Sequence, residues 1–188
     1  MLALLGEPPD DALDPELRAA VAEIAVRWAV ETGDAFISDR VAAAPPLARA
    51  FAEPAPEGVA AALGEALAGR EGPVLLVAPD VPRLDAALAR GALADVTGDS
   101  VFSFAPATDG KPFLVALQRA TPESLALIGS RDRTREEVFA QAMALGGEVG
   151  MLRSERRVVT PADAASLALD PIVPAPLRAL AACASGRR

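Results

Sequence analysis

The sequence predicts an α/β domain in which helices cover a mostly parallel sheet. The first observation is the apolar run Pro73–Pro82, Pro-Val-Leu-Leu-Val-Ala-Pro-Asp-Val-Pro, which has no polar alternation before its aspartate. Such a run is typical of a strand that is buried on both faces, as in a parallel sheet. The second observation is that strand-like runs alternate along the chain with segments that carry helix-capping signals, which favours this class of fold.

The N-terminal part is predicted to contain two short strands and two helices. Met1–Gly6 and Ala35–Ser38 are the strands. Asp14 is followed by proline and glutamate, the order expected where an N-cap acid begins a helix, and Gly33 is the expected end of that helix. The alanine-rich segment Glu57–Leu67 is predicted to form the second helix before the strand near residue 74.

The second half continues the alternation of helix and strand. Two helices are expected to begin at capping boxes, in which a threonine is followed three residues later by an acid. The predicted elements are a helix over Leu84–Leu93, a strand from Val101, an apolar strand ending at Leu117, a helix from Thr134 to Gly146, a strand over Glu148–Leu152, a helix from Thr160 through Leu169 and a short helix over Leu177–Ala182.

Length and composition restrict the class of protein. With 188 residues, 52% of them hydrophobic, the chain is long enough for one compact domain over residues 1–188. Its formal net charge of −8 argues against a nucleic-acid partner, because phosphates need a basic surface. No apolar run reaches membrane-spanning length, so the sequence predicts a cytoplasmic protein without a membrane partner.

Missing residue types exclude several kinds of site. The chain has no histidine and one cysteine, Cys183. Histidine-based triads, histidine-ligated zinc and intramolecular disulfides are therefore excluded. A bound metal would need oxygen ligands, which favours magnesium, manganese or calcium.

Two aspartates at the ends of predicted strands are the candidate site residues. Asp80 follows the first strong strand, and ligands of open α/β sheets bind beyond the carboxyl ends of strands. Asp109 precedes Gly110 and Lys111, the one lysine of the chain. The alternatives stay open, because Asp beside Pro favours turns and Asp-Gly is a common hairpin dipeptide. Lys111 is either a source of positive charge for a phosphate or a solvated surface residue.

The order of these motifs resembles a known family. Val-Leu-Leu-Val-Ala-Pro-Asp80-Val-Pro82 is followed by a helix, by Asp99-Ser-Val and by Ala-Pro-Ala-Thr-Asp109-Gly110 with an apolar strand. Further on, Arg156-Arg-Val-Val-Thr-Pro-Ala-Asp163 stands where the family has Asp-Val-Asp-Thr-Pro-Glu-Asp. The sequence resembles the GT-A type nucleotide-diphospho-sugar transferase-like proteins, in particular the bacterial glycosyltransferase group related to phospholactate guanylyltransferases.

The resemblance implies a three-layer α/β/α, Rossmann-like sandwich that binds a nucleoside triphosphate or a nucleotide-sugar. It implies that Asp80 ligates a divalent metal, magnesium or manganese, and that Asp109 acts as a catalytic residue on the acceptor side. It also places Asp80, Pro82, Gly110 and Lys111 in the nucleotide- or substrate-binding region. The first hypothesis is therefore a metal-dependent nucleotidyltransferase or glycosyltransferase.

Three departures from the family pattern support other hypotheses. The first loop, Glu7–Asp11, is acidic where the family has a basic triphosphate-binding cluster, and Lys111 replaces the usual second glycine. Val159 stands at the family's metal-binding aspartate, and Arg157 stands at its partner acid. The second hypothesis is a catalytically degenerate member that serves as a ligand-binding or protein-interaction module. The third is a homodimer in which the second subunit supplies the missing basic residues. A last hypothesis is that Arg153, Arg156 and Arg157, which lie near Val159 in the sequence, replace the metal with fixed positive charge.

Overall fold

The computed structural model describes residues 12–33, 71–108, 110, 112–122, 124, 135–144 and 148–186. The predicted strands at 1–6 and 35–38 and the predicted helix at 57–67 lie outside these residues. Within them, no helix is both long enough and apolar enough to cross a membrane.

The centre of the fold is a four-stranded mixed sheet with the order β1-β3-β2-β4. Its strands are β1 (Val74–Val77), β2 (Ser100–Pro106), β3 (Pro112–Leu117) and β4 (Glu148–Met151). β3 pairs antiparallel with both β1 and β2, and β2 pairs parallel with β4. The prediction of a mostly parallel sheet is therefore wrong for the pairings, although β1, β2 and β4 run in the same direction.

The direction of β3 follows from the short connection that precedes it. Only residues 107–111 separate β2 from β3, which is too short for the crossover that a parallel pair requires. Gly110 has φ +86°, a left-handed conformation that favours glycine, and its N–H donates to the Ala107 carbonyl at 2.9 Å. The antiparallel pairing of β2 and β3 confirms a hairpin at Gly110, whereas Asp109 lies outside the described residues.

The sequence signals for helix ends agree with the structure. The helices are α1 (Pro15–Thr32), α4 (Ala86–Thr97), α6 (Arg135–Ala144), α7 (Pro161–Leu169) and α8 (Ala175–Gly186). The Asp14 carboxylate caps α1 by accepting from the backbone N–H groups of Glu16 and Leu17. Thr160 and Asp163 form the predicted capping box of α7. α4 begins later than the predicted Leu84 and ends beyond the predicted Leu93, and α8 extends beyond its predicted range at both ends.

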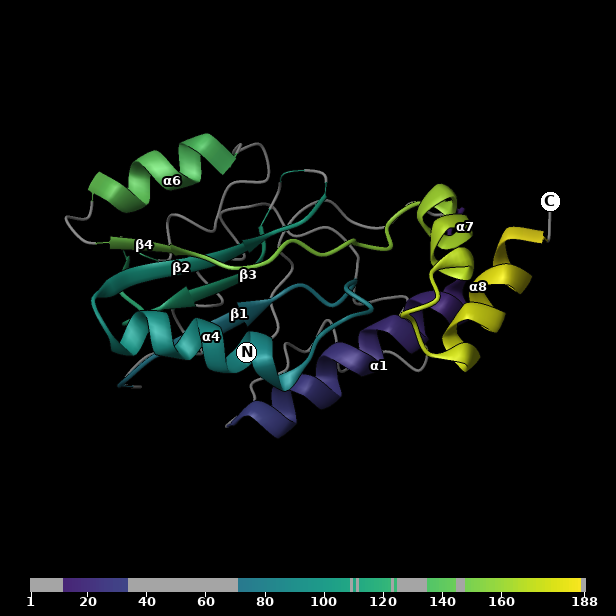
Figure 1. Ribbon diagram of the computed structural model, residues 1–188, viewed down its shortest axis with the longest axis horizontal. Helices are drawn as coiled ribbons and strands as arrows, with labels where there is room; N and C mark the ends of the chain where they lie inside the picture. The colour runs from purple at the N-terminus through teal and green to yellow at the C-terminus, as the bar shows by residue number, and fades with distance from the viewer. Residues whose placement is uncertain are drawn as a thin grey trace.

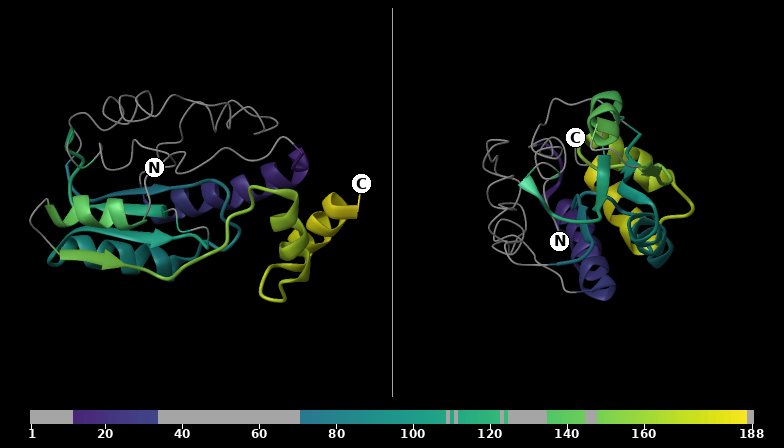
Figure 2. Two further views of the ribbon diagram at one scale, coloured as in Figure 1. Left: turned by 90° about the horizontal axis from the view of Figure 1, so that it is seen from above. Right: turned by 90° about the vertical axis from the view of Figure 1, so that its left-hand side faces the viewer.

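Two hydrophobic clusters stabilise the fold, and α1 contributes to both. The larger cluster lies between the sheet, α4 and the C-terminal half of α1, where Trp28 is buried. The smaller cluster joins the first half of α1, through Leu17 and Val21, to α7 and α8. Figure 1 shows α1 extending from below the sheet to α8, and Figure 2 shows α7 and α8 together beyond one end of the sheet. α1 therefore links the sheet to the C-terminal helical pair.

A close approach between β4 and α4 requires glycine at position 150. A Cβ atom added to Gly150 would lie 2.7 Å from the Ser103 hydroxyl oxygen and closer still to the Asp95 carboxylate. That hydroxyl donates to Asp95 at 2.6 Å, so the neighbours are held in place by a hydrogen bond.

We expect Gly150→Ala to lower the free energy of unfolding by about 1–3 kcal/mol, because the added methyl group overpacks this contact. Urea denaturation measures the change. Gly186→Ala is the control, because nothing lies within 4 Å of a Cβ added there. Equal stability of the two variants would contradict the packing described for β4.

Candidate functional site

The candidate site lies where the three co-directional strands end. Asp80 comes three residues after β1, Ala107 directly follows β2, and Glu155 and Arg157 lie in the extended segment after β4. A parallel bridge joins Ala107 to Glu155, and the Val158 N–H donates to the Asp80 carbonyl at 2.8 Å. The segment after β4 therefore lies against the end of β1, in the region where open α/β sheets bind ligands.

Asp80 and Arg157 form a buried ion pair in this region. Their exposed fractions are only 3% and 4%. Arg157 Nε donates to Asp80 Oδ1 at 2.9 Å, and Arg157 Nη2 donates to Asp80 Oδ2. The guanidinium thus binds both carboxylate oxygens in the bidentate arrangement that gives strong, directional hydrogen bonds.

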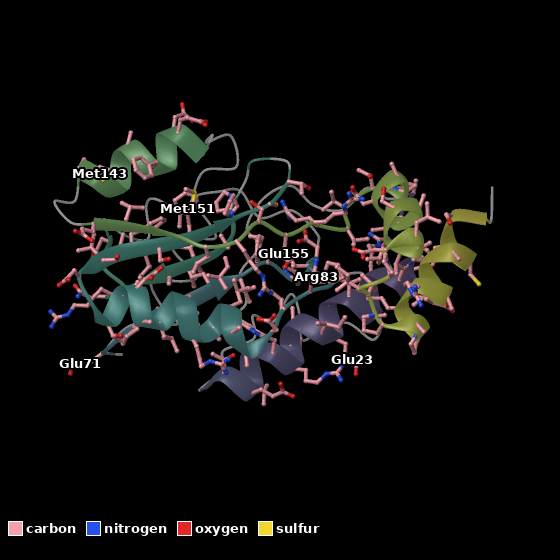
Figure 3. All side chains as sticks on the ribbon, in the orientation of Figure 1. Glu23, Glu71, Arg83, Met143, Met151 and Glu155 are labelled. Atoms are coloured by element: carbon pink, nitrogen blue, oxygen red, sulfur yellow. The ribbon has the colours of Figure 1, made fainter. Side chains whose placement is uncertain are left out.

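A second buried acid organises the arginines beside this pair. Glu155 is 5% exposed, its Oε1 accepts from Arg153 Nε at 2.9 Å, and its Oε2 lies 3.4 Å from Arg83 Nη1. Arg153 Nη2 also lies 2.9 Å from Asp85 Oδ2. Figure 3 shows Arg83 and Glu155 next to each other near the middle of the molecule. The arginines of this network are therefore bound to carboxylates of the same chain.

Asp85 has two roles at the edge of the network. Its carboxylate caps α4 by accepting from the Leu88 N–H at 2.8 Å, and it pairs with Arg153. Partial burial acts to raise the pKa of Asp85, but the Leu88 hydrogen bond and the Arg153 guanidinium outweigh it and hold this pKa below its ordinary value of 3.8. The charged form of Asp85 is therefore favoured in the folded state.

We expect Asp85→Asn to reduce stability at pH 7 and to have less effect in acid. Because the folded-state pKa of Asp85 is lowered, its contribution is present above 3.8 and is lost as the pH falls through the lowered value. Asparagine keeps the capping oxygen, so the change isolates the charge. Urea denaturation at pH 7 and pH 3 measures the difference, and a stability loss that is unchanged at pH 3 would contradict the ionic role.

The structure separates the residues that the sequence singled out. Asp80 is in the ion pair, whereas Pro82 is buried and lines a groove on the side of α1. Gly110 lies in the β2–β3 hairpin. Asp109 and Lys111 lie outside the described residues, so their predicted catalytic and substrate-binding roles remain predictions.

The described residues do not fit the divalent metal that the family resemblance implies. Both oxygens of Asp80 accept hydrogen bonds from Arg157, which occupies the position of the family's partner acid. Val159 has no oxygen in its side chain that could serve as a ligand. Among the residues that the structure describes, no three His, Cys, Asp or Glu side chains are grouped so that they could hold a metal ion. Metal ligation by Asp80 remains a prediction.

Glu155, Arg83 and Asp85 were not predicted from the sequence as parts of the site. A signal is present in the segment Arg153-Ser-Glu-Arg-Arg157, in which charged residues recur with a period of two. Alternate residues of an extended segment lie on the same side. In the structure Glu155 and Arg157 are buried, whereas Arg156 between them is exposed.

Comparisons with known proteins support the family resemblance seen in the sequence at the level of the fold. No protein-family model and no curated protein matches the sequence. The crystal structure of a proposed nucleotide-diphospho-sugar transferase from Desulfovibrio desulfuricans matches with a TM-score of 0.59 over 89% of this chain and 84% of that chain. The chain shares this fold. At 18% identity the similarity shows the fold alone and does not indicate a specific activity.

Proposed function

We propose that this chain is a degenerate nucleotide-diphospho-sugar transferase-like domain that has exchanged a metal-binding acid for Arg157 and serves as a binding module. The observation that carries the proposal is the buried, bidentate Asp80–Arg157 ion pair. A metal ion bound at Asp80 would have to displace a guanidinium that is itself buried, and breaking a buried ion pair is costly.

The charge balance of the network supports the same proposal. Among the residues that the structure describes, the carboxylates of Asp80, Asp85 and Glu155 are matched by the guanidinium groups of Arg83, Arg153 and Arg157. A triphosphate placed here would have to compete with internal carboxylates for each arginine. Transferases stabilise the transferring phosphoryl group with metal ions and cations that are available to it.

Metal-dependent nucleotidyl or glycosyl transfer is the alternative function. It is favoured by the gathering of Asp80, Glu155 and Arg157 at the ends of co-directional strands, which is the usual ligand region of such sheets. In this alternative, substrate binding would have to release Asp80 from Arg157.

Thermal unfolding with a panel of nucleoside triphosphates and nucleotide-sugars, with and without Mn²⁺, separates the two functions. A ligand at a hundred times its dissociation constant adds about 2.7 kcal/mol to stability, which is readily visible as a shift of Tm. We expect no shift that requires Mn²⁺. A Mn²⁺-dependent shift for one nucleotide that disappears in Asp80→Asn would overturn the proposal and favour the transferase.

A further inference from the structure

A groove lies between α1, α8 and the loop that connects β1 to α4, beside the ion-pair network, and Asp85 belongs to both. Its volume is about 660 Å³. Trp28 and Ile24 of α1, Leu84 of the loop and Leu177 and Leu180 of α8 supply its apolar lining. Three prolines also line it, namely Pro82, Pro174 and Pro176.

Internal contacts hold the lining of the groove in place. The Trp28 indole N–H donates to the Asp85 carbonyl at 2.8 Å, which fixes the ring against the beginning of α4. Leu177 is buried in the smaller hydrophobic cluster, and Ile24 and Leu180 pack against that cluster. Since proline also restricts the backbone, a partner that binds here would cause little loss of conformational entropy in the groove itself.

Acidic side chains predominate around this apolar lining. Glu23 and Glu31 line the groove, together with Asp85, whose charge is paired with Arg153, and with Arg27 as the one basic residue among the lining residues. All four of these lining residues are exposed. The whole chain has a formal charge of −8, which adds to the negative potential. The groove therefore complements a partner that carries both apolar and basic side chains.

We infer that this groove binds a protein segment whose apolar side chains are flanked by lysine or arginine. A small-molecule ligand is disfavoured, because such sites orient their ligands with a few convergent polar groups and the charged residues here are exposed. A second copy of the chain is disfavoured too, since a two-fold contact would bring the same acidic border against itself. The inference rests on the proposed function, because it names the partner of a domain kept for binding.

Selection of displayed random peptides on the full chain tests this inference. We expect the enriched peptides to combine apolar residues with lysine or arginine. We also expect Glu23→Lys/Glu31→Lys to weaken the binding of these peptides by about tenfold, the scale expected when rim charges are reversed. Both positions are exposed, so the variant should keep its fold, which circular dichroism checks.

The control is Glu71→Lys/Glu148→Lys, which changes two exposed acids that do not line the groove. Each double variant raises the formal net charge by four, from −8 to −4. Figure 3 shows Glu23 and Glu71 well apart. Equal loss of binding in both variants would show that the overall charge of the chain, and not the groove, determines binding. That result would overturn the inference. Enriched peptides without basic residues, or a dimer that only the groove variant dissociates, would also overturn it.

Failure of this inference and failure of the proposed function can be told apart. If the groove binds basic peptides but a nucleotide stabilises the chain only with Mn²⁺, the proposed function fails and the groove remains. If neither nucleotides nor peptides bind, the groove inference fails while the account of the Asp80–Arg157 pair is unaffected.

Discussion

Replacing Arg157 with methionine is expected to lower the free energy of unfolding by about 3–5 kcal/mol. The change leaves the Asp80 carboxylate, which is 3% exposed, without the guanidinium that binds both of its oxygens. Removing one partner of a buried ion pair is strongly destabilising, because the other charge stays buried without compensation. Urea denaturation of the two chains measures the difference.

The double variant Asp80→Leu/Arg157→Met shows whether the loss comes from the unpaired charge. Because it removes both charges, we expect it to be more stable than Arg157→Met alone, in a non-additive double-mutant cycle. Arg156→Met is the matched control, since Arg156 is exposed and a surface change of this kind alters stability by about 0.5 kcal/mol or less. If the losses of stability in Asp80→Leu and in Arg157→Met add up to the loss in the double variant, the two side chains do not interact and the ion pair is contradicted.

Phe104→Ala is expected to have an equally large effect, with a loss of about 3–5 kcal/mol in the free energy of unfolding. Phe104 is 1% exposed in β2, and its ring centroid lies 5.9 Å from that of Phe102 on the same face of the strand. Removing the ring leaves a cavity between the sheet and its covering elements. Chemical denaturation measures the loss.

Phe139→Ala in α6 is the matched control for this prediction. The Phe139 side chain is 42% exposed, so the same substitution there removes much less buried surface. A loss of stability at Phe139 as large as that at Phe104 would contradict the burial of Phe104 in the core.

Local signals in the sequence predicted the beginnings of α1 and α7 well. The Asp14 cap of α1 and the Thr160 capping box of α7 depend on residues within three or four positions of each other, so a single sequence contains all the information required. The buried strand β1 was likewise predicted, because its uninterrupted apolar run is typical of a covered strand.

Relations between distant segments were predicted less well. The pairing of β1 with β3, which joins segments far apart in the sequence, was not predicted. The direction of β3 was also predicted wrongly, although the short hairpin that begins after Pro106 determines it locally. The partner of Asp80 is 77 residues away along the chain. The sequence led to the hypothesis that arginines near Val159 replace a metal ion. Neither residue type nor spacing indicates which of Arg153, Arg156 and Arg157 reaches the buried acid.

The central claim is that Arg157 occupies the place of a metal ion at Asp80. Titration of the folded chain with Mn²⁺, followed by electron paramagnetic resonance in the presence of the nucleotide panel, tests this claim most directly. We predict that the chain binds no more Mn²⁺ than Asp80→Asn does under the same conditions. Binding of one Mn²⁺ per chain that is lost in Asp80→Asn would contradict the claim.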